Sequence, residues 1–195
     1  MLRPLPISFL QVGLFWAVMV VGAAALIRAL ASRERGAAAK KSQLATIGIV
    51  LQGVGFGAVA FGPIHIALPW NASSSLVCSM LVLVLGGSAV GIFIAATRAM
   101  GKNWSIVART RSDHQLVRTG PFAVIRHPIY FALFLYMLSF GVAFGHLRQF
   151  IIAVPLYLIG ALIRIREEEK LLRAQFGEDH ARYVREVPAF IPFIG

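Results

Sequence analysis

The residues best suited to chemistry lie in two stretches in the second half of the chain. One is the segment RHPIY at 126–130, and the other is the segment RIREEEK at 164–170. Imidazole, guanidinium and carboxylate groups brought together can bind a ligand that carries charges of both signs. Both stretches border long apolar runs, so the sequence predicts a polar site at the mouth of an apolar bundle.

Pro128 determines how His127 is presented. Proline disfavours the helical conformation for the residue before it, yet it suits the first position of a helix. We therefore expect a helix that begins at Pro128, with His127 at its entrance. The first-turn N–H groups near Ile129 and Tyr130 lack helical partners and suit a carboxylate or a phosphate. Taken alone, a histidine at such a position is more often an interface residue than a site residue.

Arg164 and Glu168 are spaced to lie on one face of a helix. They are four residues apart, and Gly177 is placed to end that helix. The pair can hold a zwitterionic ligand, or the two side chains can hold each other, and spacing alone favours the ion pair. Glu167 and Glu169 are predicted to lie on a solvated face.

Other kinds of catalytic site are not indicated. We predict no metal, because the remaining histidines lack the spacing of metal ligands: His65, His114, His146 and His180. No GxSxG or comparable nucleophile motif occurs. The segment GVGFG at 53–57 has no strand before it, so it lacks the context of a nucleotide-binding loop. Its glycines, like Gly87 and Gly91, are predicted to permit close helix contact.

The elements that must position these residues are membrane helices. The 195-residue chain is 58% hydrophobic with a mean hydropathy of +0.76, which is more apolar than one soluble core of this size can hide. Five apolar stretches cover residues 7–30, 44–68, 75–97, 129–146 and 150–163, of which the last two are shorter than the ~20 residues that span a bilayer core. Because backbone groups in lipid must bond internally, we predict an all-α polytopic membrane protein with five transmembrane helices.

The basic residues predict the orientation of these helices. Lys and Arg collect in the first connection, in the third connection and in the tail after residue 163, whereas the second connection has no charge and the fourth has only Arg148. This alternation predicts an N-terminus outside and a cytoplasmic C-terminal tail. The net charge of +11 forms no single basic stripe, so it indicates contact with anionic membrane lipids rather than nucleic acid.

Several motifs in order along residues 103–192 resemble one family. They are NWS at 103–105, HQLVRTGPF at 114–122, RHPIY at 126–130, Arg164 followed by Glu168 and Glu169, Phe176-Gly177, Tyr183, Val187-Pro188 and Pro192. Together they resemble the isoprenylcysteine carboxyl methyltransferase family and its bacterial relatives. The first three apolar stretches match that family only in being hydrophobic. We therefore expect a three-helix transmembrane region at 1–98 and, from the resemblance, a catalytic methyltransferase region at 99–195.

The resemblance also implies a cofactor and a set of site residues. The cofactor is S-adenosylmethionine, held in a pocket outside any Rossmann fold by the C-terminal helical region. Its contacts would come from His114, Gln115, Leu116, Val117, Phe122, His127, Pro128, Tyr130 and Glu168, while Arg164 would face the methyl acceptor. Phe122 stands where the family usually has tyrosine, so a hydroxyl hydrogen bond is missing there.

The physical chemistry of these residue types suits such a reaction. Glu168 would offset the positive centres of the cofactor, and the helix entrance at His127 would bind its carboxylate. Arg164 could hold an acceptor carboxylate by paired hydrogen bonds. A lipophilic acceptor, most simply a prenylcysteine-like carboxylate, would enter from the bilayer and the cofactor from the cytoplasm. Catalysis would then depend mainly on Arg164 and Glu168.

Two other functions are compatible with parts of the sequence. Membrane reductases of the sterol type, which use NADPH, share a similar segment that resembles RHPNYxGE, but this chain has Ile129 and then FAL at 131–133. A non-enzymatic scaffold or transporter is the third candidate, although the absence of charge deep in any predicted span argues against an ion path. The small-residue spacings permit self-association without requiring it.

Overall fold

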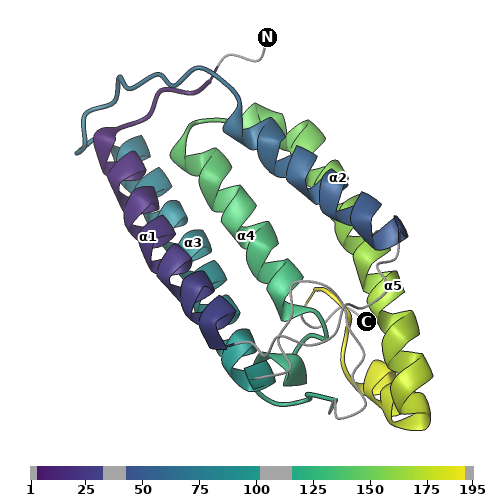
Figure 1. Cartoon of the computed structure of the whole chain (residues 1–195). Coiled ribbons are helices and arrows are strands. Elements are labelled where there is room, and N and C mark those ends of the chain that lie inside the picture. The colour runs from purple at the N-terminus through teal and green to yellow at the C-terminus, as the bar shows by residue number, and fades with distance from the viewer. Residues whose placement is uncertain (1–3, 33–42, 102–115, 192–195) are drawn as a thin grey trace.

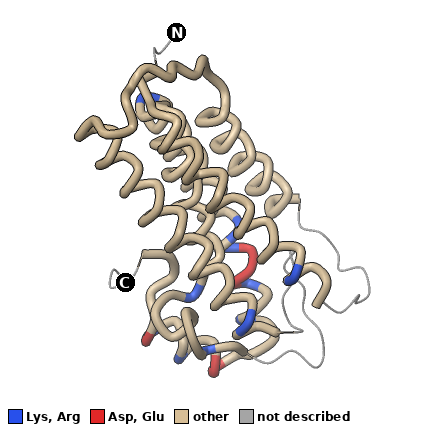
Figure 2. The backbone as a smooth tube through the Cα atoms, turned by 90° about the vertical axis from the view of Figure 1, so that its left-hand side faces the viewer, with Lys and Arg blue, Asp and Glu red and all other residues tan. Residues whose placement is uncertain are grey.

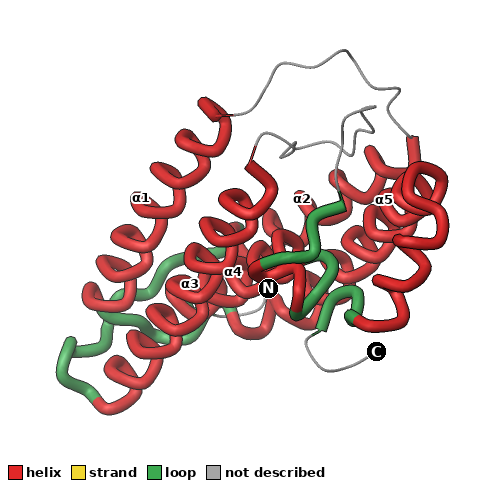
Figure 3. The backbone as a smooth tube through the Cα atoms, turned by 90° about the horizontal axis from the view of Figure 1, so that it is seen from below, coloured by secondary structure: helices red, strands yellow, loops and turns green. Residues whose placement is uncertain are grey.

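The fold is a bundle of apolar helices. The computed structural model describes residues 4–32, 43–101 and 116–191. Five α-helices follow in order: α1 (Phe9–Ser32), α2 (Gln43–Ala60), α3 (Ser73–Met100), α4 (Pro128–Ala143) and α5 (Phe150–Glu186). Two short 3₁₀ helices precede α4 and α5, η2 (Gly120–Ala123) and η3 (Leu147–Gln149). Figure 3 shows helices joined by loops throughout this described part. The expected all-α fold is confirmed.

Two helix pairs flank a central helix. α1 packs on α3 and α2 packs on α5, while α4 lies between the two pairs and also packs closely on α3 (Figure 1). One apolar cluster joins α2, α4 and α5 around Val59, Met137 and Tyr157. A second joins α1, α3 and α4 around Phe15 and Val82. α4 is therefore the element through which the two halves of the bundle share a core.

The surface of the bundle matches a lipid environment. Among the described residues, four helices are long and apolar enough to cross a membrane, and α4 is a shorter apolar helix of 16 residues. Large apolar side chains point outward from several of them, including Val20 (64% exposed), Met80 (62%) and Ile151 (76%). In Figure 2 the charged residues gather toward one end of the bundle. The protein is an integral, multi-pass membrane protein.

The helix formed by the second apolar stretch is shorter than the stretch itself. α2 stops at Ala60 instead of continuing to residue 68, because Gly62 and Pro63 follow. The rest of that stretch is a loop that pairs with the segment before α1. Ile7 N donates to His65 O at 2.9 Å, and Ala67 N donates to Ile7 O at 3.0 Å.

The last helix continues far past the predicted span. α5 runs without interruption from the apolar residues into the charged segment and bends at Gly177, whose φ is +50°. Glycine readily adopts a positive φ, so the first helical segment ends at Gly177 as predicted, but a second segment follows the kink and continues to Glu186. Beyond the bend the chain turns back toward the start of α4 (Figure 1).

Of the predicted glycines, Gly55 makes a close helix contact, since a Cβ added there would lie 3.0 Å from Ala153 O of α5. Closer contacts occur at two glycines that were not predicted. A Cβ added at Gly48 would lie 2.8 Å from Gly160 O, and one added at Gly160 would lie 2.6 Å from Gly48 O, so these two glycines let α2 and α5 approach. The prediction of close contact was wrong for the glycines spaced four apart. An added Cβ would meet no described atom within 4 Å at Gly53, Gly57, Gly87 and Gly91.

Candidate active site

The entrance of α4 is built as the sequence predicts. The helix begins at Pro128, and His127 before it has the non-helical angles φ −122° and ψ 60°. The C-terminal segment holds this entrance, since Arg126 N donates to Pro188 O at 2.9 Å and His127 N donates to Ala189 O at 3.0 Å. His127 makes no side-chain cap, so its ring is available to other groups.

The His127 ring lies between two carboxylates of α5. Its Nε2 is 3.2 Å from Glu169 Oε1, and its Nδ1 is 3.5 Å from Glu168 Oε2. The residue is buried, with 7% of its surface exposed. Burial alone would lower the pKa of His127, but the hydrogen bonds and negative charges of the two glutamates outweigh it and raise that pKa. The geometry therefore favours an imidazolium that donates to both carboxylates.

Glu168 is the centre of a second set of contacts. The Tyr130 hydroxyl donates to Glu168 Oε1, and Arg164 Nη2 lies 3.9 Å from the same oxygen. The Arg164 guanidinium lies over the Tyr130 ring at 4.6 Å from its centroid, and the His127 ring stacks on the same Tyr130 ring with 5.8 Å between the two ring centroids. Four predicted site residues from two distant stretches of sequence thus meet in one cluster.

Gln52 joins this cluster from α2. Arg164 Nη1 donates to Gln52 Oε1 at 3.0 Å, and Gln52 is only 6% exposed. The sequence analysis missed this residue. The signal that could have found it is an amide side chain in the middle of an apolar span, because polar groups inside membrane helices are costly and commonly serve a function.

Glu169 was predicted on a solvated face, and this prediction was wrong. Arg126 Nε donates to Glu169 Oε1 at 2.8 Å, and the Glu169 side chain is 24% exposed. Burial would raise the pKa of Glu169, but hydrogen bonds and charges from His127 and Arg126 lower it to about 2. Glu167 is also largely covered, at 16% side-chain exposure, and accepts a hydrogen bond from Lys170 at 2.7 Å.

Arg126 connects this ion pair to the backbone of the C-terminal segment. Its Nη1 donates to the carbonyls of Val187 and, at 3.2 Å, Val184. The guanidinium is therefore fixed on both sides, by Glu169 and by two carbonyl groups. The sequence analysis named Arg126 only as part of a motif. Its partners are far away in the sequence, so spacing could not predict them.

The predicted cofactor loop is described only in part. His114 and Gln115 lie outside the described residues, as do the motif residues 103–105 and Pro192. Leu116 and Val117 are half-buried, and the loop is tied to the C-terminal segment just after them. Arg118 pairs with Glu186 and lies 5.2 Å from the centre of the Tyr183 ring.

Phe122 is fixed to the same C-terminal segment. It lies in η2 with 9% of its surface exposed, and its carbonyl accepts a hydrogen bond of 2.6 Å from the Tyr183 hydroxyl. Burial raises the pKa of Tyr183 to about 12, so the hydroxyl remains a donor at neutral pH. The loop, the start of α4 and the end of α5 thus form one connected unit.

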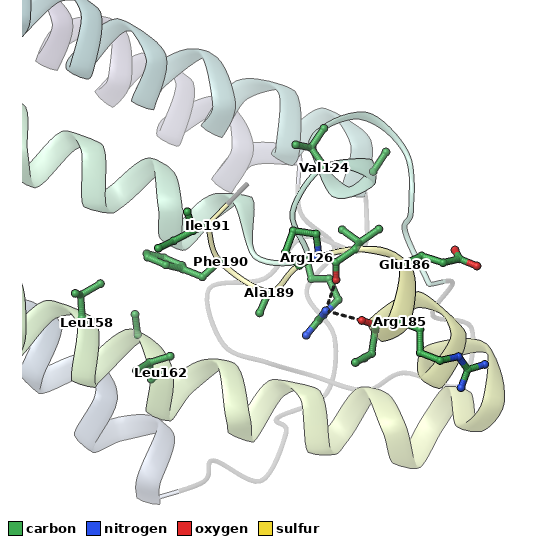
Figure 4. A pocket seen from close by; sticks show the side chains of 14 residues that line it. Val124, Arg126, Leu158, Leu162, Arg185, Glu186, Ala189, Phe190 and Ile191 are labelled. Carbon is green, nitrogen blue, oxygen red and sulfur yellow. Dashed lines mark hydrogen bonds between the residues drawn. The ribbon is translucent and has the colours of Figure 1, made fainter. Parts of the chain in front are cut away.

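An apolar cavity of about 910 Å³ lies beside Arg126 (Figure 4). Its wall combines α5, the loop before α4 and the C-terminal segment, with side chains that include Leu158, Leu162, Val124, Phe190 and Ile191. Arg126 also lines it and links it to the ion pairs, since the same guanidinium binds Glu169.

His180, beyond the bend of α5, is a further buried polar residue near these charges. It is 1% exposed, and neither ring nitrogen has a hydrogen-bond partner within the described part of the chain. Within residues 4–32, 43–101 and 116–191 the structure holds no group of three or more potential metal ligands.

Sequence comparison supports the resemblance of the second half of the chain. Residues 79–174 match the profile of the isoprenylcysteine carboxyl methyltransferase family. Similar proteins include protein-S-isoprenylcysteine O-methyltransferase of Xenopus laevis, 32% identical over 124 residues, covering 58% of this chain and 40% of the relative. The enzyme of the same name from Saccharomyces cerevisiae is 31% identical over 103 residues, covering 51% of this chain and 42% of the relative.

A relative with a different name matches similarly. The cobalt-zinc-cadmium resistance protein CzcN of Cupriavidus metallidurans is 30% identical over 115 residues, covering 58% of this chain and 50% of the relative. The matched segments thus span about half or less of the length of these curated relatives.

The fold is also similar to a solved structure. The eukaryotic intramembrane Ras methyltransferase ICMT matches with a TM-score of 0.57 at 20% sequence identity, covering 95% of this chain and 68% of that one. This similarity concerns the arrangement of helices. The profile match and the named relatives show that residues 79–174, just under half of the chain, are similar to the isoprenylcysteine carboxyl methyltransferase family.

Proposed function

We propose that this protein transfers a methyl group from S-adenosylmethionine to a lipophilic acceptor at the cytoplasmic face of the membrane. The acceptor group is the carboxylate of a prenylcysteine-like molecule. The observation that carries the proposal is the single cluster formed by His127, Tyr130, Arg164 and Glu168. The match of residues 79–174 to the methyltransferase family profile supports methyl transfer over the alternative of an NADPH-dependent reductase.

The residues around the start of α4 fit the charges of S-adenosylmethionine. When bound, it supplies a methyl group on a positively charged sulfur. His114, Gln115, Leu116, Val117, Phe122, His127, Pro128, Tyr130 and Glu168 would hold it. The first turn of α4 has no side-chain cap and suits its carboxylate, while Glu168 provides negative charge for its cationic groups. Phe122 can contribute packing but no hydroxyl hydrogen bond.

The Tyr130 hydroxyl and His127 would keep Glu168 in place for this role. The hydroxyl donates to Glu168 from the first turn of α4, and His127 Nδ1 lies 3.5 Å from the same carboxylate at the helix entrance. The carboxylate is therefore held from two sides before any ligand binds. Such preorganisation reduces the reorganisation needed during the reaction.

Arg164 would position the acceptor. Its guanidinium is held by Gln52, Tyr130 and Glu168, so its orientation is fixed. A carboxylate acceptor is already a nucleophile and needs no base, so orientation and exclusion of water are the main contributions of the protein. The apolar cavity beside Arg126 supports an acceptor with a hydrocarbon chain.

The direct test uses purified protein, methyl-labelled S-adenosylmethionine and a small prenylated cysteine with a free carboxylate. The same compound with its carboxylate converted to an amide is the matched control. We expect label to enter the free acid as an ester that base releases as methanol, and no label in the amide. Label that appears equally in both compounds, or no transfer to the acid, contradicts the proposal.

A further inference from the structure

Gln52 lies in α2, outside the residues 79–174 that match the family profile. We propose that Gln52 is a specificity-determining residue of the acceptor site, whose side-chain amide donates a hydrogen bond to the acceptor carboxylate beside Arg164. The inference rests on the proposed function, because it assumes that Arg164 binds a methyl acceptor. It extends that function by assigning part of the acceptor site to the N-terminal half of the chain.

The two ends of the Gln52 amide differ in their contacts. Oε1 accepts the hydrogen bond from Arg164 Nη1 at 3.0 Å. Nε2 is buried and has no hydrogen-bond partner among the residues that the structure describes. Buried amide groups are usually hydrogen-bonded, because removing them from water without a partner is costly. The unsatisfied donor therefore points to a ligand that supplies the missing acceptor.

The neighbouring hydroxyl does not satisfy this donor. The Tyr157 hydroxyl lies within reach of the Gln52 amide, but its own proton goes to Tyr130 O at 2.7 Å, and Nε2 finds no hydrogen-bond partner of full geometry among the described residues. The amide nitrogen also carries two N–H groups. Even if the Tyr157 oxygen accepted one of them, the second would still lack a partner.

The packing of α2 on α5 holds Gln52 in this position. An added Cβ at Gly160 would lie 2.9 Å from Gln52 N and 3.0 Å from Gln52 Cγ. One added at Gly48 would lie 2.6 Å from Arg164 Cγ. The closest approach of the two helices therefore occurs where the amide meets the guanidinium. Gly48 and Gly160 make room for this pair.

The chemistry of the pair matches a carboxylate. The amide N–H groups and the guanidinium are both donors, and a carboxylate has two oxygens that can accept from both. A thiol or an amine acceptor offers a single reacting atom and leaves one of the donors without a partner. Since a site with an unpaired buried donor discriminates strongly, Gln52 would favour carboxylate acceptors over thiols and amines.

The competing explanation is that Gln52 only positions Arg164. Gln52→Glu separates the two roles. The introduced carboxylate still accepts from Arg164, which keeps it ionised, but it no longer donates and it repels a bound carboxylate. Gln52→Met has a similar length and removes both functions. Gln11→Met is the matched control, since Gln11 is a buried glutamine (1% exposed) whose side chain bonds to Ser8 and Val142 rather than to Arg164.

The experiment compares acceptor KM with the affinity for S-adenosylhomocysteine, the product of the cofactor. We expect Gln52→Glu and Gln52→Met each to raise the KM for the prenylated free acid by about tenfold or more, with the Kd for S-adenosylhomocysteine changed less than about twofold. Gln11→Met should change neither constant by more than about twofold. Retained S-adenosylhomocysteine binding shows that each variant is folded.

Two results would overturn the inference while leaving the proposed function intact. In the first, Gln52→Glu keeps the wild-type acceptor KM, so that Gln52 serves only to hold Arg164. In the second, the variants lose affinity for acceptor and S-adenosylhomocysteine equally. If instead the wild-type protein methylates no prenylated acid, the proposed function fails, and the role of Gln52 fails with it.

Discussion

His127 Nδ1 lies 3.5 Å from Glu168 Oε2, which joins the entrance of α4 to the charged part of α5. The contact continues in both directions. Glu169 connects His127 to Arg126, and Glu168 connects it to Arg164. Positive and negative groups alternate along this chain of contacts, so a change at one member alters the charge seen by its neighbours.

Arg164→Lys should impair acceptor use more than cofactor use. Lysine keeps the charge but cannot make the paired hydrogen bonds of a guanidinium or hold the same position over Tyr130. We expect the acceptor KM to rise about tenfold, with the KM for S-adenosylmethionine within about twofold of wild type. Arg166→Lys, at an exposed neighbouring position, is the control. Equal effects of Arg164→Lys on both constants would remove Arg164 from the acceptor site.

The pair of Glu169 with Arg126 and His127 should make the protein sensitive to acid. Because the pKa of Glu169 is lowered from 4.5 to about 2, its stabilising effect is complete above pH 4.5 and is lost as the pH falls toward 2. The raised pKa of His127 acts in the opposite sense, since its contribution is complete below pH 6.5 and is lost as the pH rises through the folded-state value.

Thermal unfolding in detergent from pH 3 to 8 measures these contributions for wild type and Glu169→Gln. We expect the variant to be less stable near pH 6 and the difference from wild type to shrink toward pH 3. Glu178→Gln is the control, because the Glu178 side chain is 79% exposed. A constant difference across the pH range would mean that the ion pair does not operate as the geometry indicates.

The same substitution at two glycines of α2 should have opposite effects. Gly48→Ala places a Cβ 2.6 Å from Arg164 Cγ and 2.8 Å from Gly160 O, so it should destabilise the protein by about 1–3 kcal/mol. Gly53→Ala meets no described atom within 4 Å and should be neutral or slightly stabilising. Thermal unfolding in one detergent compares them directly. Equal stability of the two variants would refute the close contact of α2 with α5.

The orientation in the membrane can be tested independently of the chemistry. The distribution of basic residues predicts that a reporter fused after Gly195 lies in the cytoplasm. A paired enzyme reporter, one active only inside and one active only outside, measures this. Activity of the outside reporter would reverse the topology and move the proposed site to the other face.

The sequence predicted the helices where hydropathy and backbone chemistry agree. Pro128 fixed the start of α4 and Gly177 marked the bend of α5, because each has a strong backbone preference of its own. The early end of α2 was missed, since hydropathy continues through Gly62 and Pro63 into the loop. Gly62 and Pro63 both disfavour a helix, so giving them more weight than hydropathy would have predicted the end of α2 correctly.

The contacts between helices were less predictable. The spacing of Gly53 and Gly57 resembles a packing motif, yet the contact with α5 uses Gly48 and Gly55 on another face of α2. Spacing alone cannot show which face meets a partner. The same limit applies to Glu169 and Gln52. Their partners, Arg126 and Arg164, come from other parts of the chain, so their roles depend on tertiary packing.

The most direct test of the whole account is titration calorimetry of the purified protein with S-adenosylmethionine and, separately, with NADPH. We expect saturable binding of S-adenosylmethionine that Glu168→Gln weakens by about tenfold or more and that Glu167→Gln leaves within about twofold, and no binding of NADPH. Binding of NADPH without S-adenosylmethionine, or wild-type affinity in Glu168→Gln, would contradict it.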